Sequence, residues 1–153
     1  ERSRGLGDVY KRQGLPIGAY FFSQALSMDE ADQEIEYMLG ILGDYRLDMP
    51  IILDWEIPAS DARTANMDAR TLTDIQLYFC EKMKGLGYQP MVYFNWHQSE
   101  NLYYLSELED FPFWLALYQD RMRYPWKVEM WQYTCTGRVP GINGDVDINV
   151  YMP

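Results

Sequence analysis

Pro50-Ile51-Ile52-Leu53-Asp54-Trp55-Glu56 is the stretch of this chain that says most about its fold. A short apolar run with a proline on either side is typical of a strand buried on both faces, as in the parallel sheets of α/β proteins. Side chains alternate across a strand, so Asp54 and Glu56 are expected on one side and Trp55 on the other. Two carboxylates therefore emerge together at the strand end where α/β folds place their active sites.

The two carboxylates have an ordinary interpretation and a chemical one. Acids that directly follow a strand are often solvated loop residues or helix caps. Strand geometry, however, separates the Cβ atoms of Asp54 and Glu56 by roughly 6–7 Å, and from there the carboxyl groups can reach the separations used in glycoside hydrolysis. The spacing permits that chemistry without choosing its stereochemistry.

Length and composition indicate one soluble domain with a hydrophobic core. The chain has 153 residues, of which 48% are hydrophobic, and no apolar run is long enough to cross a bilayer. Its 23 acidic and 13 basic residues give a formal charge of -10, which disfavours nucleic acid because phosphate binding needs clustered Lys and Arg. Aromatic residues make up 16% of the chain, and they suit either core packing or a sugar-binding cleft.

The cysteines and the histidine exclude several common kinds of site. Cys80 and Cys135 are too far apart in the sequence to form a metal or redox motif, and whether they pair is left open. His97 is the only histidine, so a zinc site of several histidines is excluded. No nucleophile-elbow motif accompanies it. The leading interpretation therefore expects no metal and no cofactor.

Alternating patterns predict a β/α protein. Strands are predicted over residues 14–22, 50–56, 90–94, 113–118, 127–133 and 146–149. Helices are predicted over 27–43 with a capping box of Ser27 and Glu30, over about 71–86 with Thr71 as the cap, and over about 99–105. The early alternation of strand and helix predicts a parallel sheet, and the later strands follow without full helices between them.

Six segments in order resemble the family 25 glycoside hydrolases, the N-acetylmuramidase-type lysozymes that include many phage endolysins. The matching segments are Gly18-Ala19-Tyr20-Phe21-Phe22 and residues 52–56, 87–93, 113–118, 131–133 and 141–149. The resemblance implies an irregular TIM-like β/α barrel of five βα units followed by three strands. It also implies cleavage of the β-1,4 bond between N-acetylmuramic acid and N-acetylglucosamine in bacterial peptidoglycan.

The resemblance further implies a role for individual residues. Glu56 is similar to the family's general acid/base, and Asp54 to the partner that orients the substrate N-acetyl group in a substrate-assisted retaining mechanism. Asp147 is similar to the C-terminal active-site Asp. Crowding of the central pair raises one of its two pKa values, and the sequence does not choose which. The residues expected to bind substrate, each of which also has a packing interpretation, are Tyr20, Tyr93, Trp114, Tyr118 and Gln132.

The start of the chain departs from the family pattern. The family opens with an Asp-bearing strand and then a second strand, and neither precedes Gly14, because residues 8–10 match only superficially. We therefore expect residues 1–13 to be a non-native or disordered leader, and 14–153 to be a partial catalytic domain that lacks the first two barrel strands. Such a fragment could be inactive. The complete protein is expected to be a monomer that acts outside the cell or at the cell wall, without a membrane partner.

Two other interpretations remain open. One is a catalytically silent module that binds cell-wall sugars through its aromatic residues. The other is a metal-dependent barrel hydrolase that uses Asp54, Glu56 and Asp147 as oxygen ligands for Mg²⁺ or Ca²⁺. A chitinase-type barrel is disfavoured, because Ile51 and Ile52 stand where its longer motif needs further acids.

Overall fold

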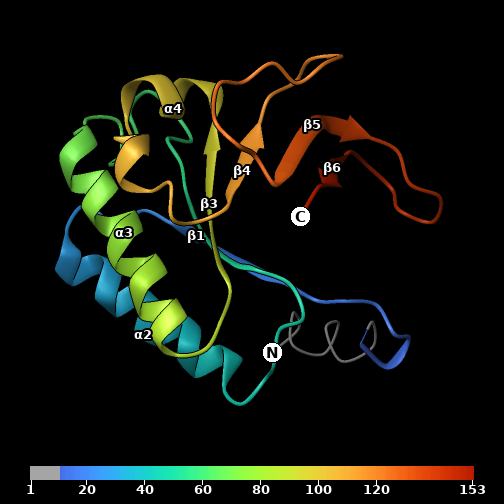
Figure 1. Ribbon diagram of the computed structural model, residues 1–153, viewed down its shortest axis with the longest axis horizontal. Coiled ribbons are helices and arrows are strands. Elements are labelled where there is room, and N and C mark those ends of the chain that lie inside the picture. The colour runs from blue at the N-terminus through green and yellow to red at the C-terminus, as the bar shows by residue number, and fades with distance from the viewer. Residues whose placement is uncertain (1–10) are drawn as a thin grey trace.

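The computed structural model describes residues 11–153 and shows one curled sheet with helices on one face (Figure 1). Its six strands, in spatial and sequence order, are β1 (Ala19–Ser23), β2 (Ile51–Trp55), β3 (Pro90–Asn95), β4 (Phe113–Ala116), β5 (Met130–Gly137) and β6 (Val146–Tyr151). Neighbours from β1 to β5 are parallel, and β6 runs antiparallel to β5. The mixed α/β class is confirmed as a six-stranded half-barrel. A closed TIM-like barrel and the loss of two strands stay predictions.

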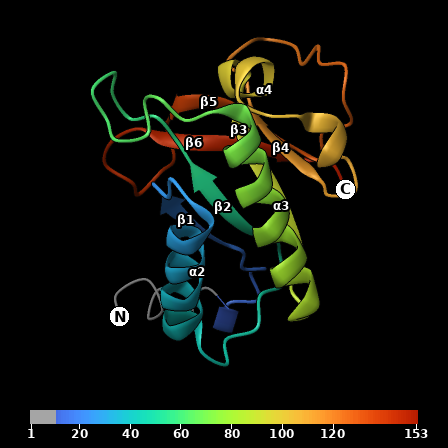
Figure 2. The ribbon, with the colours of Figure 1, turned by 90° about the vertical axis from the view of Figure 1, so that its left-hand side faces the viewer.

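The two long helices cover the same face of the sheet. Figure 2 shows α2 (Met28–Leu42) and α3 (Ala69–Gly85) in front of the strands. The shorter α4 (Trp96–Asn101) and the 3-10 turn η1 (Leu105–Glu107) follow β3. Within residues 11–153, no helix combines the length and the apolar character that a membrane span requires.

Side-chain caps decide where the helices begin. Ser27 caps α2 as predicted, since its hydroxyl accepts a hydrogen bond from the Glu30 N–H. The cap of α3 is Asp68 rather than Thr71, whose N–H donates to the Asp68 carboxylate at 2.9 Å. The helix predicted over about 99–105 begins earlier, because Asn95 and the N3 residue of α4 form a capping box directly after β3.

The pairing of β5 with β6 also moves a predicted boundary. β5 covers Met130–Gly137 instead of residues 127–133, because its second half is paired with β6 through two register shifts. The chain between these strands turns at Gly141 and Gly144, which have φ angles of 90° and 113°. The hydrogen-bonded turn in this connection joins the Ile142 N–H to the Val139 carbonyl oxygen at 3.1 Å.

Residues of β2 alternate between two apolar clusters. Ile51, Leu53 and Trp55 belong to the main core that packs against α2 and α3. Ile52 belongs to a smaller cluster on the opposite face. The other buried members of that cluster are Met91, Tyr93, Ala116 and Met130. The predicted alternation is confirmed, so Asp54 leaves the sheet on the face that the helices do not cover.

The expected leader falls mostly on residues that the structure does not describe. Residues 1–10 lie outside the described part of the chain. Lys11 forms an ion pair with Asp48 at 3.4 Å. The division into a leader over 1–13 and a catalytic domain over 14–153 stays a prediction.

Candidate active site

Asp54 and Glu56 lie at the carboxyl end of β2, where both side chains are half-buried. Burial, together with the charges of Glu56 and Asp147, raises the pKa of Asp54 to about 7. The Oδ1 atom of Asp54 is buried and has no hydrogen-bond partner among the described residues. Glu56 and Asp147 therefore both act electrostatically on Asp54, whose Oδ1 is a buried acceptor that no described residue satisfies.

Tyr93 of β3 holds one oxygen of the Glu56 carboxylate. Its hydroxyl donates a hydrogen bond to Glu56 Oε1 at 3.1 Å. Burial and the charges of Glu56 and Asp54 raise the pKa of Tyr93 above its ordinary value, so the hydroxyl keeps its proton and remains a donor. The Tyr93 ring also packs edge-on against Trp114, with the ring centroids 4.8 Å apart.

Tyr20 and Trp114 add aromatic surface on the same face. Their rings meet edge-to-face at a centroid distance of 6.4 Å, and the Tyr20 side chain is 64% exposed. Trp114 Nε1 donates to Asn149 Oδ1 at 2.9 Å, which ties β4 to β6 across β5. The exposed Tyr20 ring and the half-buried Trp114 ring offer apolar surface against which a sugar ring can pack.

Tyr118 and Gln132 join the site from the β4 and β5 side. The Tyr118 hydroxyl donates to Gln132 Oε1 at 2.8 Å, where Gln132 is buried and Tyr118 is exposed. Burial, the neighbouring Cys135 thiol and the Asp147 carboxylate raise the pKa of Tyr118 to about 12. Asp147 is exposed on β6, and its charge acts on both Tyr118 and Asp54. The structure thus brings together all the residues that the sequence nominated, while their roles stay predictions.

Sequence reasoning missed the residues that support this face. Asn149 anchors Trp114, and it could have been found because it stands two positions after Asp147 and therefore on the same side of a strand. Three buried side chains donate hydrogen bonds to backbone carbonyl oxygens of residues 53–56. They are Thr64, Gln76 and Gln98. No local signal marks Thr64 and Gln76, because single polar residues in helices and loops are usually on the surface. Gln98 stands three residues after Asn95, a capping-box spacing that could have placed it in the first turn of a helix.

His97 and the cysteines take no part in a recognisable metal or redox centre. His97 is exposed on α4, where its ring contacts the Asn101 side chain at 3.3 Å. Cys80 is buried, Cys135 is exposed, and neither is in a disulfide. Across residues 11–153, the structure forms no group of three or more His, Cys, Asp or Glu side chains suited to a metal ion. The metal-dependent interpretation therefore gains no support from the geometry.

The fold and the site together define an α/β half-barrel with acids at the carboxyl end of a central parallel strand, the arrangement of β/α-type glycosidases. The family model for glycosyl hydrolases family 25 matches residues 8–142. The chain belongs to this family. Asp147 lies beyond the matched residues.

Individual relatives agree with the family. The protein YegX of Escherichia coli (strain K12) is 29% identical over 150 residues, which are 92% of this chain and 50% of YegX. The solved structure of the CTP1L endolysin is 26% identical with a TM-score of 0.75, over 93% of this chain and 49% of that one. The autolysin LytC of Streptococcus pneumoniae, solved in complex with a synthetic peptidoglycan ligand, is 26% identical with a TM-score of 0.80, over 94% and 36%. The chain thus spans about half the length of the curated relatives that it matches.

Proposed function

We propose that the protein to which this chain belongs hydrolyses bacterial peptidoglycan, at the β-1,4 bond between N-acetylmuramic acid and N-acetylglucosamine. Membership of glycosyl hydrolases family 25 supports the reaction class. An endolysin and a peptidoglycan-bound autolysin among the similar structures support the substrate. The observation that carries the proposal is the meeting of Asp54, Glu56 and Asp147 on one open face, with the Tyr93 hydroxyl bonded to Glu56.

Glu56 is the proposed general acid/base. In a substrate-assisted reaction, the N-acetyl oxygen of the substrate attacks the anomeric carbon while Glu56 gives a proton to the departing sugar oxygen. Water then opens the resulting ring and returns a proton to Glu56. Asp54 orients the substrate amide N–H, and the hydrogen bond from Tyr93 keeps Glu56 aimed at the scissile oxygen.

The surrounding residues are proposed to bind the glycan. Tyr20 and Trp114 form the aromatic platform, and Tyr118 with Gln132 supplies polar contacts on its other side. None of these steps requires a metal or a cofactor. The site of action is then the cell wall, reached from outside the cell or by release from a phage-infected cell.

Digestion of purified walls tests the bond specificity. The products are reduced with borohydride and analysed by mass spectrometry, with and without chelator. The proposal expects reduced muramic acid ends in both arms. Reduced glucosamine ends would show cleavage of the other bond, and loss of activity with chelator would support the metal-dependent alternative.

The aromatic platform also suits a catalytically silent sugar-binding module. That function predicts that the chain sediments with insoluble walls but releases no reducing ends.

A further inference from the structure

At the end of β2 that carries the acids, pairing with β3 stops before pairing with β1 does. Pairing between β2 and β3 ends at Leu53 and Val92. Pairing between β2 and β1 continues to Trp55 and Ser23. Where this pairing ends, the backbone carbonyl groups of the segment need other donors, because buried backbone acceptors are nearly always satisfied.

Buried side chains supply those donors. The donors Gln76, Gln98 and Thr64 reach the carbonyl oxygens of Leu53, Trp55 and Glu56 at 3.0, 2.6 and 3.0 Å, respectively. All three donor residues are buried. The Trp55 indole adds a fourth hydrogen bond, to the Ala25 carbonyl oxygen at 2.9 Å. The segment behind the carboxylates is therefore fixed from the side of the helices.

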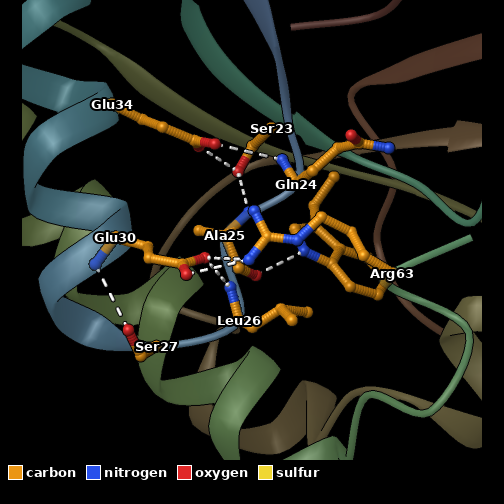
Figure 3. Close-up of polar contacts among 9 residues, drawn as sticks. Ser23, Gln24, Ala25, Leu26, Ser27, Glu30, Glu34 and Arg63 are labelled. Carbon is orange, nitrogen blue, oxygen red and sulfur yellow. Dashed lines mark hydrogen bonds and ion pairs between the residues drawn. The ribbon is translucent and has the colours of Figure 1, made fainter.

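Thr64 belongs to a loop, residues 57–68, that is itself anchored to α2. Arg63 Nη2 lies 2.8 Å from both carboxylate oxygens of Glu30 (Figure 3). On the same helix, Glu34 accepts hydrogen bonds from Ser23 and from the Gln24 N–H, which fixes the loop after β1. The Arg63 ion pair is exposed, so it contributes little by itself.

Gln98 differs from the other donors because it uses both ends of its amide. Its Oε1 accepts a hydrogen bond at 2.8 Å from the N–H of Asn95, the last residue of β3, while its Nε2 donates to Trp55 on β2. The amide thus links the ends of β2 and β3 by hydrogen bonds at a position where the two strands no longer pair directly. We propose that Gln98 is a positioning residue, which holds the end of β2 against β3 so that Glu56 stays within reach of the Tyr93 hydroxyl. The catalytic consequence of this inference rests on the proposed function.

Replacing Gln98 by Met keeps the length of the side chain and removes both hydrogen bonds. On soluble peptidoglycan strands, kcat should fall on the order of 10²-fold, because a small displacement of a catalytic group is enough for such a loss. KM should stay within about twofold, since the substrate-binding residues are untouched. Gln33→Met, the same change on the exposed face of α2, is the matched control and should leave both constants unchanged.

Gln98→Glu distinguishes positioning from packing, and it serves if Gln98→Met does not fold. A protonated carboxyl group donates and accepts as the amide does, whereas the ionised group only accepts and repels the Trp55 carbonyl oxygen. The ratio of variant to wild-type lysis should therefore fall as pH rises through the pKa of the introduced group. A ratio that is constant with pH would show that only the volume of the side chain matters.

An NMR titration of the Asp54 carboxyl group tests the inference without catalysis. If the end of β2 moves away from β3, water reaches Asp54 and its pKa should fall in a folded Gln98→Met variant, but not in Gln33→Met. An unchanged Asp54 pKa would overturn the inference, whether or not walls are lysed. Absence of lysis by every variant and by the wild type would instead count against the proposed function, because the titration remains interpretable.

Discussion

Neighbouring residues at the end of β2 point to opposite faces of the sheet, so one side chain packs in the core and the next belongs to the candidate active site. Trp55 is buried in the main core and donates from its indole to the Ala25 carbonyl oxygen. Asp54 and Glu56, on either side of it, reach the open face, where burial raises the pKa of Asp54 to about 7. The same strand thus anchors the site and presents its acids.

Replacing Glu56 by Gln tests the proposed acid/base directly. The amide oxygen can still accept the Tyr93 hydrogen bond, so the fold should survive, whereas the group can no longer exchange a proton. Wall lysis should fall by about 10²–10⁴-fold, the usual contribution of a positioned acid/base. Turbidity clearing measures the loss, with Glu100→Gln on the exposed side of α4 as the control. Full activity of Glu56→Gln would refute the assignment.

Asp54 should make the folded state less stable as the pH rises. The pKa of Asp54 is raised from its ordinary value of 3.8 to about 7 on folding. Between these values the folded chain binds more protons than the unfolded chain, so the stability that this group contributes is complete below about pH 4 and is lost as pH approaches 7 and above.

The variant Asp54→Asn cannot ionise at this position and should lose that part of the pH dependence. Relative to wild type, its free energy of unfolding should rise by roughly 1–2 kcal/mol between pH 4 and pH 8, a value reduced for the partial exposure of the group. Urea unfolding at several pH values measures it. Parallel pH profiles for the two proteins would contradict the expected shift in the Asp54 pKa.

At the scale of elements, local patterns predicted the strands and the long helices but not all their boundaries. β2 and α2 were predictable, because an apolar run and the Ser27 cap are local signals. The start of α4 is set by the local capping box of Asn95 and Gln98, whereas the hydrogen bond from Gln98 to Trp55 of β2 joins residues distant in the sequence and had no local signal. Gln76 is likewise buried where it donates to the Leu53 carbonyl oxygen of β2, a tertiary contact without a local pattern.

The candidate site also contains residues that the sequence could predict and a contact that it could not. Asp54 and Glu56 were predictable from strand alternation alone, and Asp147 through the family resemblance. The hydrogen bond between Tyr93 and Glu56 could not be predicted, because it depends on the register of β2 against β3.

Two glycines should respond oppositely to the same substitution. A Cβ atom at Gly137 on β5 would lie 2.3 Å from Ile148 Cδ1 and 2.9 Å from the Val146 carbonyl oxygen, both on β6. Gly137→Ala should therefore destabilise the fold by about 1–3 kcal/mol, as overpacking does, and disturb the strand that carries Asp147. Gly40 in α2 has open space around it, so Gly40→Ala should stabilise by about 0.5–1 kcal/mol. Thermal unfolding compares them, and a loss of stability in both would show that the β5–β6 contact is not the cause.

At the scale of the whole molecule, the described sheet ends at β1 with an apolar surface beside it. Within residues 11–153, β1 pairs only with β2, and residues of β1 and α2 line a cavity of about 650 Å³. Tyr37 and Ile41 of α2 line this cavity, and both are exposed. An unpaired strand edge beside exposed apolar side chains favours association with another chain.

We therefore expect the 153-residue chain to melt at low temperature and to self-associate through this surface. Ile41→Glu should weaken the association, because burying an unpaired carboxylate in the contact is costly. Leu86→Glu, at the exposed end of α3, makes the same change in net charge and should not weaken it. Sedimentation velocity at about 1–100 µM, the range in which exposed apolar surface drives association, measures the difference. The contrary result would be a monomer with normal lytic activity and a sharp unfolding transition that does not depend on concentration. The sheet would then be stable and functional with the edge of β1 exposed to water.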